Sequence, residues 1–96
     1  MSFRSMATII IPSALRLRQN NLPGEFEVEA ETVGDALRLL TETFPGLNDA
    51  LFQTDGALRS TLRVFVDAES IDRLNGLETP LGRAREIFLL LPIAGG

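Results

Sequence analysis

The sequence contains no cysteine, histidine, lysine, tyrosine or tryptophan. Without cysteine there is no disulfide framework, no thiolate nucleophile and no cysteine-based zinc site. Without histidine the chain lacks the commonest general base and metal ligand, and without lysine no side chain forms a Schiff base. These absences argue against an enzyme, although the carboxylate-based sites of glycosidases use only residue types that are present here.

The charge and hydropathy of the chain restrict its partners. Thirteen acidic residues against nine arginines give a formal net charge of −4. A nucleic-acid binder needs a basic surface, so we expect no nucleic-acid partner. The longest apolar run, residues 87–91, is far shorter than the roughly 20 residues that cross a bilayer, and the first residues lack the apolar core of a signal peptide. We therefore expect a cytoplasmic protein without a membrane partner.

Five segments have the composition of β-strands in a chain whose 96 residues suit a single domain. We expect strands at residues 7–12, 25–31, 62–67 and 87–91, and a short strand at residues 71–74. The clearest alternation is that of residues 25–31, where four glutamates point to solvent. We interpret this segment as an edge strand protected by like charge, in preference to a metal site.

A helical pattern follows the second expected strand. Thr32 is the expected N-cap, because Asp35 completes a capping signature three residues later. Apolar residues at three- and four-residue spacing form one stripe as far as Phe44, where a Pro-Gly pair stops the helix. A short helical turn is expected between residues 47 and 52. The residues expected to line the helix–sheet interface are Ile9, Ile11, Phe26, Val28, Leu37, Leu40, Phe44, Leu62, Val64, Val66, Ile87, Leu89 and Leu91.

The order strand, strand, helix, strand, short strand, strand predicts an α+β domain. One main helix packs on one face of a mixed sheet of four to five strands, which is the β-grasp arrangement, and the other face stays open. The first two strands form a hairpin with a long loop. We expect residues 1–5 to be a disordered extension, residues 6–92 to form the domain and residues 93–96 to be a flexible tail.

The sequence ends in Gly95-Gly96, a pair that adds no packing and costs conformational entropy. Because Pro92 cannot donate a ladder hydrogen bond, we expect an extended, exposed finger after it. A finger without β-carbons can enter a narrow channel of a partner and present its carboxylate. For the glycines taken alone, fraying or a cloning remnant is the alternative interpretation.

Several stretches of the chain together resemble one known family. They are Glu31-Thr-Val-Gly-Asp-Ala-Leu37, Phe44-Pro-Gly-Leu47, Leu62-Arg-Val-Phe-Val-Asp67, Ile71-Asp, Leu77-Glu-Thr-Pro-Leu81 and Leu91-Pro-Ile-Ala-Gly-Gly96. Over about residues 6–96 the chain resembles the ubiquitin-like sulfur carriers of the MoaD/ThiS family. The final stretch is the most specific, because an apolar residue before a terminal Ala-Gly-Gly is the hallmark of this family.

The resemblance implies that Gly96 is the reactive residue and that Ala94 and Gly95 belong to the tail that carries it. In this family a ubiquitin-activating-type adenylyltransferase uses ATP to form an acyl-adenylate at the terminal carboxylate. A sulfur donor then displaces AMP, and a sulfur-accepting synthase consumes the thiocarboxylate. The resemblance thus implies a protein co-substrate that binds no cofactor or metal itself, since ATP, zinc and magnesium belong to the partner.

The resemblance does not identify the biosynthetic pathway that receives the sulfur. Family members serve molybdopterin, thiazole, cysteine and specialised sulfur-metabolite pathways, and residues 11–16 and 62–81 resemble the cysteine-pathway and stand-alone carriers most. A molybdopterin synthase small subunit, a ubiquitin-like protein modifier and a β-grasp binding module are the alternatives. Without lysine, a modifier of this sequence cannot build chains on itself through lysine side chains.

Strand alternation predicts a docking face on the open side of the sheet. Ile10, Phe65, Phe88 and Leu90 point away from the helix if their neighbours in the strands face it. In a β-grasp sheet the first, third and last strands are central neighbours, so these side chains cluster on the uncovered face. Clustered apolar side chains mark an interaction surface, and we expect this one to dock on the activating enzyme. Shelter by a loop or self-association is the alternative.

Overall fold

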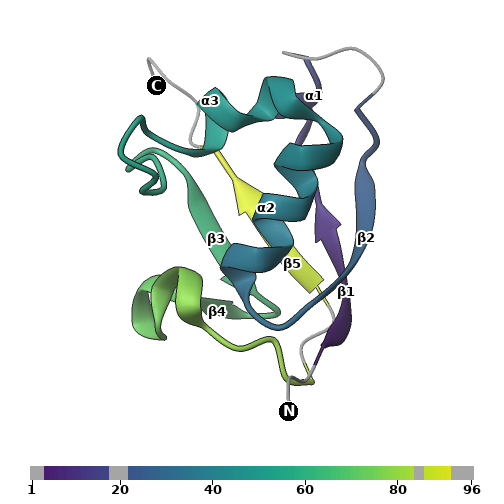
Figure 1. Ribbon diagram of the computed structural model, residues 1–96, viewed down its shortest axis with the longest axis vertical. Helices are drawn as coiled ribbons and strands as arrows, with labels where there is room; N and C mark the ends of the chain where they lie inside the picture. Colours follow the sequence, from purple (N-terminus) through teal and green to yellow (C-terminus); the bar gives the residue numbers. More distant parts are fainter. Residues whose placement is uncertain (1–3, 18–21, 84–85, 92–96) are drawn as a thin grey trace.

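The computed structural model describes residues 4–17, 22–83 and 86–91 (Figure 1). Four predicted strands and the main helix are confirmed, with bounds that differ by at most two residues. β1 begins at Ser5, one residue before the predicted start of the domain. The elements are β1 (Ser5–Ile10), α1 (Ser13–Arg16), β2 (Glu25–Ala30), α2 (Val33–Thr43), the 3₁₀ helix η1 (Pro45–Leu47), α3 (Asn48–Leu51), β3 (Arg63–Val66), β4 (Glu69–Ser70), the 3₁₀ helices η2 (Ile71–Arg73) and η3 (Gly76–Glu78), and β5 (Glu86–Leu90).

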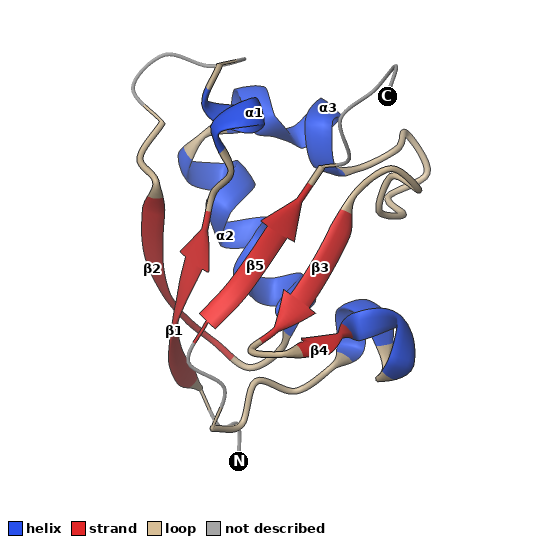
Figure 2. Ribbon diagram, turned by 180° about the vertical axis from the view of Figure 1, so that it is seen from behind, coloured by secondary structure: helices blue, strands red, loops and turns tan. Residues whose placement is uncertain are grey.

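The strands form one mixed five-stranded sheet in the order β2-β1-β5-β3-β4. β1 and β5 are parallel, and the other neighbouring pairs are antiparallel. α2 crosses one face of this sheet (Figure 1), and the view from behind shows β1, β5 and β3 in front of it (Figure 2). The predicted ubiquitin-like β-grasp class is therefore confirmed, with β1, β5 and β3 in the middle of the sheet.

The N-terminus of α2 has the predicted cap. The side-chain oxygen of Thr32 accepts a hydrogen bond from the backbone N–H of Asp35 at 3.1 Å, which satisfies one of the donors that a helix start leaves free. The buried residues of the helix recur at the predicted spacing: Val33, Ala36, Leu37 and Leu40. In the described part of the chain, no helix is long and apolar enough to cross a membrane.

The core contains most of the predicted residues and several more. Phe26, Phe44 and Leu91 of the predicted set are only partly buried. The rings of Phe26 and Phe44 meet edge to face, with centroids 5.7 Å apart, and so pack the loop end of the hairpin against the C-terminal end of α2. Core residues outside the predicted set include Leu15, Leu22, Leu47, Leu51, Ile71 and Leu81.

The predicted strand at residues 71–74 is wrong. Ile71–Arg73 forms the 3₁₀ helix η2, and the short strand β4 lies just before it at Glu69–Ser70. The hydroxyl of Ser70 accepts a hydrogen bond from the backbone N–H of Asp72 at 3.2 Å, which turns the chain out of the sheet. Ile71 is buried in η2 as it would be in a strand, so its apolar character did not distinguish a strand from a 3₁₀ helix.

The long loop expected between the first two strands contains the unpredicted helix α1 (Ser13–Arg16). One turn is too short to show helical periodicity in a sequence. Tertiary burial stabilises this turn, because the side chain of Leu15 is completely buried in the core.

Candidate functional site

Three of the four predicted docking residues form one row across the middle of the sheet. Ile10 of β1 is the register partner of Phe88 of β5, and Phe88 is the register partner of Phe65 of β3. The adjacent positions Ile9 and Ile87 are completely buried on the side of α2. Because strand side chains alternate, the row faces the open side seen in Figure 2.

Leu90, the fourth predicted docking residue, lies further along β5 on the same face. Its register partner is Arg63 of β3. Leu90 is 47% exposed, whereas Ile10, Phe65 and Phe88 are partly buried. Side chains opposite one another on neighbouring strands cover part of each other's surface. The structure therefore brings all four residues to one face, with Leu90 as its most open member.

Charged side chains border this apolar row, and the sequence analysis did not identify them as its neighbours. On β2, Glu25 is the register partner of Ile10. In the adjacent row, Thr8 stands between Glu27 and Glu86. Which glutamates lie beside the row depends on strand order and register, for which the sequence offers no local signal.

The other border of the face is formed by an exposed ion pair. Arg63 of β3 and Asp72 of η2 approach to 3.4 Å. A pair this exposed contributes little to stability, but it keeps a cationic and an anionic group close to Leu90. The apolar residues thus lie between carboxylates at one margin and an ion pair at the other.

The predicted tail residues lie outside the described part of the chain: Ala94, Gly95 and Gly96. Leu91 is the last described residue, and it lines a small cavity of about 360 Å³ together with Asp49, Arg59 and Thr61. The Nε of Arg59 donates a hydrogen bond to the carbonyl oxygen of Asp49, which ties the loop before β3 to α3. Polar groups therefore surround the point from which the chain continues toward Gly96.

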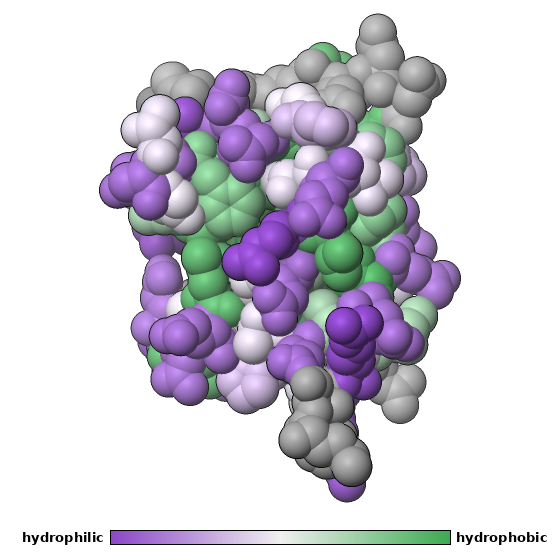
Figure 3. All heavy atoms as spheres, viewed as in Figure 1, coloured by the Kyte–Doolittle hydropathy of each residue, from purple (hydrophilic) through white to green (hydrophobic). Residues whose placement is uncertain are grey.

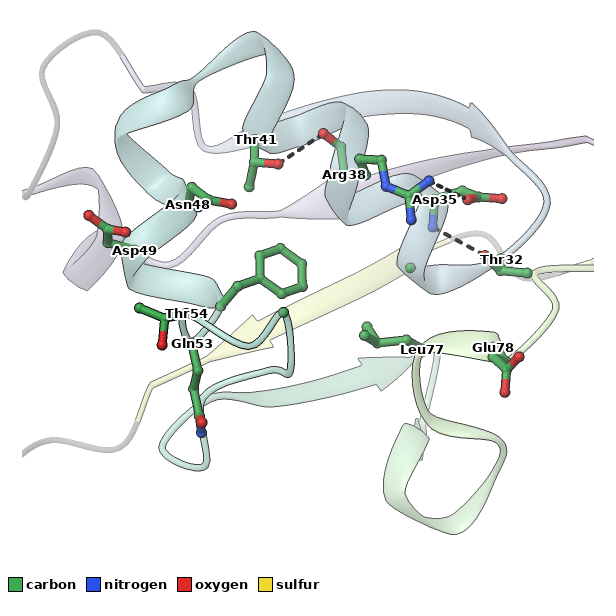
Figure 4. Close-up of a pocket in the computed structure, with 13 residues that line it drawn as sticks. Thr32, Asp35, Arg38, Thr41, Asn48, Asp49, Gln53, Thr54, Leu77 and Glu78 are labelled. Carbon is green, nitrogen blue, oxygen red and sulfur yellow. Dashed lines mark hydrogen bonds and ion pairs between the residues drawn. The ribbon is translucent and has the colours of Figure 1, made fainter.

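A larger cleft of about 830 Å³ lies beside α2, on the other side of the sheet from the apolar row (Figure 4). Figure 3 shows apolar surface next to the polar residues along this side. Gly34 allows one wall to approach closely, because a β-carbon there would lie 3.0 Å from the carbonyl oxygen of Leu77. Among residues 4–17, 22–83 and 86–91, no three His, Cys, Asp or Glu side chains are grouped to hold a metal ion.

Comparisons with known proteins agree on one type of protein. The model of the ThiS family matches residues 18–96. A protein of Archaeoglobus fulgidus, described as a candidate sulfur carrier protein, is 27% identical over 84 residues, which cover 85% of this chain and 96% of that protein. The solution structure of small archaeal modifier protein 1 from Methanosarcina acetivorans has a TM-score of 0.82 and 26% identity, covering 99% of this chain and 100% of that one. The structure of the BexX/CysO complex of Amycolatopsis orientalis shares the fold, with a TM-score of 0.81 at 23% identity over 94% of this chain and 99% of that one.

Proposed function

This chain belongs to the ThiS family, and we propose that it is a sulfur carrier protein whose reactive group is the carboxylate of Gly96. The observation that carries the proposal is the family match itself, which extends to Gly96 and so includes the Gly95-Gly96 pair. The β-grasp sheet supports it, since the last strand, β5 (Glu86–Leu90), delivers the chain to the tail.

The proposed chemistry takes place on the terminal carboxylate in two steps. A carboxylate oxygen of Gly96 attacks the α-phosphorus of ATP held by the partner enzyme, and pyrophosphate leaves. Sulfide, or a sulfur donor that delivers it, then attacks the acyl carbon, and AMP leaves with its bonding electrons. The product is a thiocarboxylate at Gly96. Adenylation is needed because a carboxylate is a poor electrophile, whereas AMP is a good leaving group.

The chain supplies binding and presentation in this scheme, and the partners supply the catalysis. The only side chains with acid–base or nucleophilic capacity are carboxylates and hydroxyls, because the sequence has no cysteine, histidine or lysine. We therefore assign the chain the role of a protein co-substrate that binds neither ATP nor a metal ion itself.

The apolar row is the surface that we assign to partner docking. Ile10, Phe65, Phe88 and Leu90 would contact the ubiquitin-activating-type adenylyltransferase while the tail enters its active site. Aromatic side chains at the centre of an interface often account for much of its binding energy. The structure of CysO in a complex with BexX supports stable docking by a protein of this fold. A sulfur-accepting synthase is the second proposed partner.

Protein modification is the second candidate function. The observation that favours it is the likeness to small archaeal modifier protein 1, at 26% identity over nearly the whole chain. Both functions begin with the same acyl-adenylate, and they diverge when either sulfur or a lysine amine displaces AMP. The acceptor protein determines whether the sulfur is used in a cysteine, molybdopterin or other pathway.

Mass spectrometry of the intact protein tests the proposal. The full chain, with Gly96 as its free terminus, is incubated with a ubiquitin-activating-type adenylyltransferase, ATP, magnesium and sulfide. We expect an exchange of oxygen for sulfur that maps to the C-terminal peptide. The proposal fails if this chain stays unchanged while a known sulfur carrier is converted by the same enzyme. Attachment to lysines of other proteins would instead favour the modifier function.

A further inference from the structure

On the α2 side of the molecule, α2, α3, the segment after α3 and η3 border a cleft that has the size of a ligand-binding site. Its volume of about 830 Å³ lies within the range of roughly 300–1,000 Å³ that is usual for such clefts. Along α2 the wall extends from Thr32 to Thr41, which is about 14 Å at roughly 1.5 Å per residue. An extended peptide of about four residues has that length at roughly 3.3 Å per residue.

The lining of the cleft combines apolar and hydrogen-bonding groups. Phe52 and Leu77 are half-buried against the core and form its apolar part. In Figure 4, Leu77 and Asn48 point toward the cleft from opposite sides. Among the described residues, the side-chain amides of Asn48 and Gln53 have no hydrogen-bond partner. An amide side chain can both donate and accept, as the recognition of peptide groups requires.

The charges of the lining select against anions. Among the described residues, Arg38 is the only cationic one that lines the cleft, and it pairs with Asp35 at 3.5 Å. Asp49 and Glu78 lie at opposite ends of the cleft, and both are exposed (Figure 4). A phosphate or nucleotide would be repelled by this set, whereas lysine or arginine side chains of a ligand would find a carboxylate at either end.

From this geometry we propose that the cleft binds an extended, basic segment of a partner protein. An apolar side chain of the segment packs on Phe52 and Leu77, and the backbone of the segment forms hydrogen bonds with the side-chain amides of Asn48 and Gln53. Basic side chains of the segment approach the carboxylates at the two ends of the cleft. Because the cleft and the apolar row face opposite sides of the sheet, both surfaces can be occupied at the same time.

The cleft also lies close to the origin of the tail. Asp49 lines both this cleft and the small cavity beside Leu91. A segment bound in the cleft therefore ends next to the place where the chain continues toward Gly96. The inference goes beyond sulfur transfer, since peptide binding here needs neither adenylation nor a thiocarboxylate.

A library of short random peptides displayed on phage is the probe for this site. Selected against the full chain, it should yield peptides that combine basic and apolar residues. In nuclear magnetic resonance titrations these peptides should shift the amide signals of α2, α3 and η3, and not those of Phe65 or Phe88. Failure to select any peptide, or shifts confined to the open face of the sheet, would overturn the proposal.

Charge variants provide the matched comparison. Asp49→Asn combined with Glu78→Gln should raise the Kd of a selected peptide about tenfold, because the carboxylates at both ends of the cleft are lost. Glu27→Gln combined with Glu42→Gln removes the same charge from exposed positions outside the cleft and should change the Kd by less than about twofold. Equal losses in the two double variants would mean that the peptide responds only to net charge, and the cleft would not be its site.

Discussion

Phe65 of β3 and Phe88 of β5 are register partners in the antiparallel part of the sheet, on the face that α2 leaves open. Both side chains are half-buried, and Phe88 is flanked on its other side by Ile10. A cross-strand aromatic pair contributes to the stability of a sheet as well as to its surface. The pair therefore offers a rigid apolar patch that a partner can bind without ordering it first.

The first prediction concerns this patch. Phe65→Ala should weaken binding to the adenylyltransferase by more than about 1 kcal/mol, because it removes an aromatic anchor from the centre of the row. Leu74→Ala is the control, since Leu74 is an exposed apolar residue outside the row. Calorimetric titration measures both affinities. Unchanged affinity, or a loss of stability as large as that of Leu89→Ala in the core, would refute the assignment of Phe65 to docking.

The second prediction concerns the terminus. Deleting Gly95 and Gly96, or adding one residue after Gly96, should abolish thiocarboxylate formation, because the activated carboxylate is removed or displaced. The melting temperature should stay close to that of the parent chain. Intact mass reports the sulfur exchange, and circular dichroism reports the folding. Sulfur incorporation in either variant would place the reactive group elsewhere.

The third prediction tests the stripe of α2. Leu40 is completely buried, and Leu40→Ala should lower the free energy of unfolding by roughly 2–5 kcal/mol. Leu39, its neighbour on the same helix, is 38% exposed, and Leu39→Ala should cost less than about 1 kcal/mol. Urea denaturation at equilibrium measures both values. Similar losses for the two variants would contradict the orientation of the helix.

The fourth prediction tests the cap of α2. Thr32→Ala should lower the free energy of unfolding by about 1 kcal/mol, since the backbone N–H of Asp35 loses its acceptor. Thr41 is the matched control, because its hydroxyl only donates to the carbonyl oxygen of Arg38 on the exposed side of the same helix. Thr41→Ala should leave stability within about 0.5 kcal/mol of the parent chain. A Thr32→Ala variant as stable as the control would show that the capping bond contributes nothing.

Local patterns predicted those parts of the fold whose side chains repeat along one element. The alternation of residues 25–31 predicted β2, and the apolar stripe together with Thr32 predicted α2 and its start. Patterns failed where a segment was too short to repeat. Ile71 was assigned to a strand because it is apolar. The segment is a 3₁₀ helix instead, and the hydroxyl of Ser70 caps it by accepting a hydrogen bond from the backbone N–H of Asp72.

The sequence by itself determined the β-grasp class, the cap and stripe of α2, and the resemblance that includes Gly96, because each depends on local patterns and on their order along the chain. Only the tertiary structure decided that Ile10, Phe88 and Phe65 form one row and that Glu25 adjoins it, since strand order and register are set by contacts between distant segments. The cleft beside α2 likewise exists only in three dimensions. Its walls come from α2, α3, the segment after α3, and η3, which no spacing in the sequence connects.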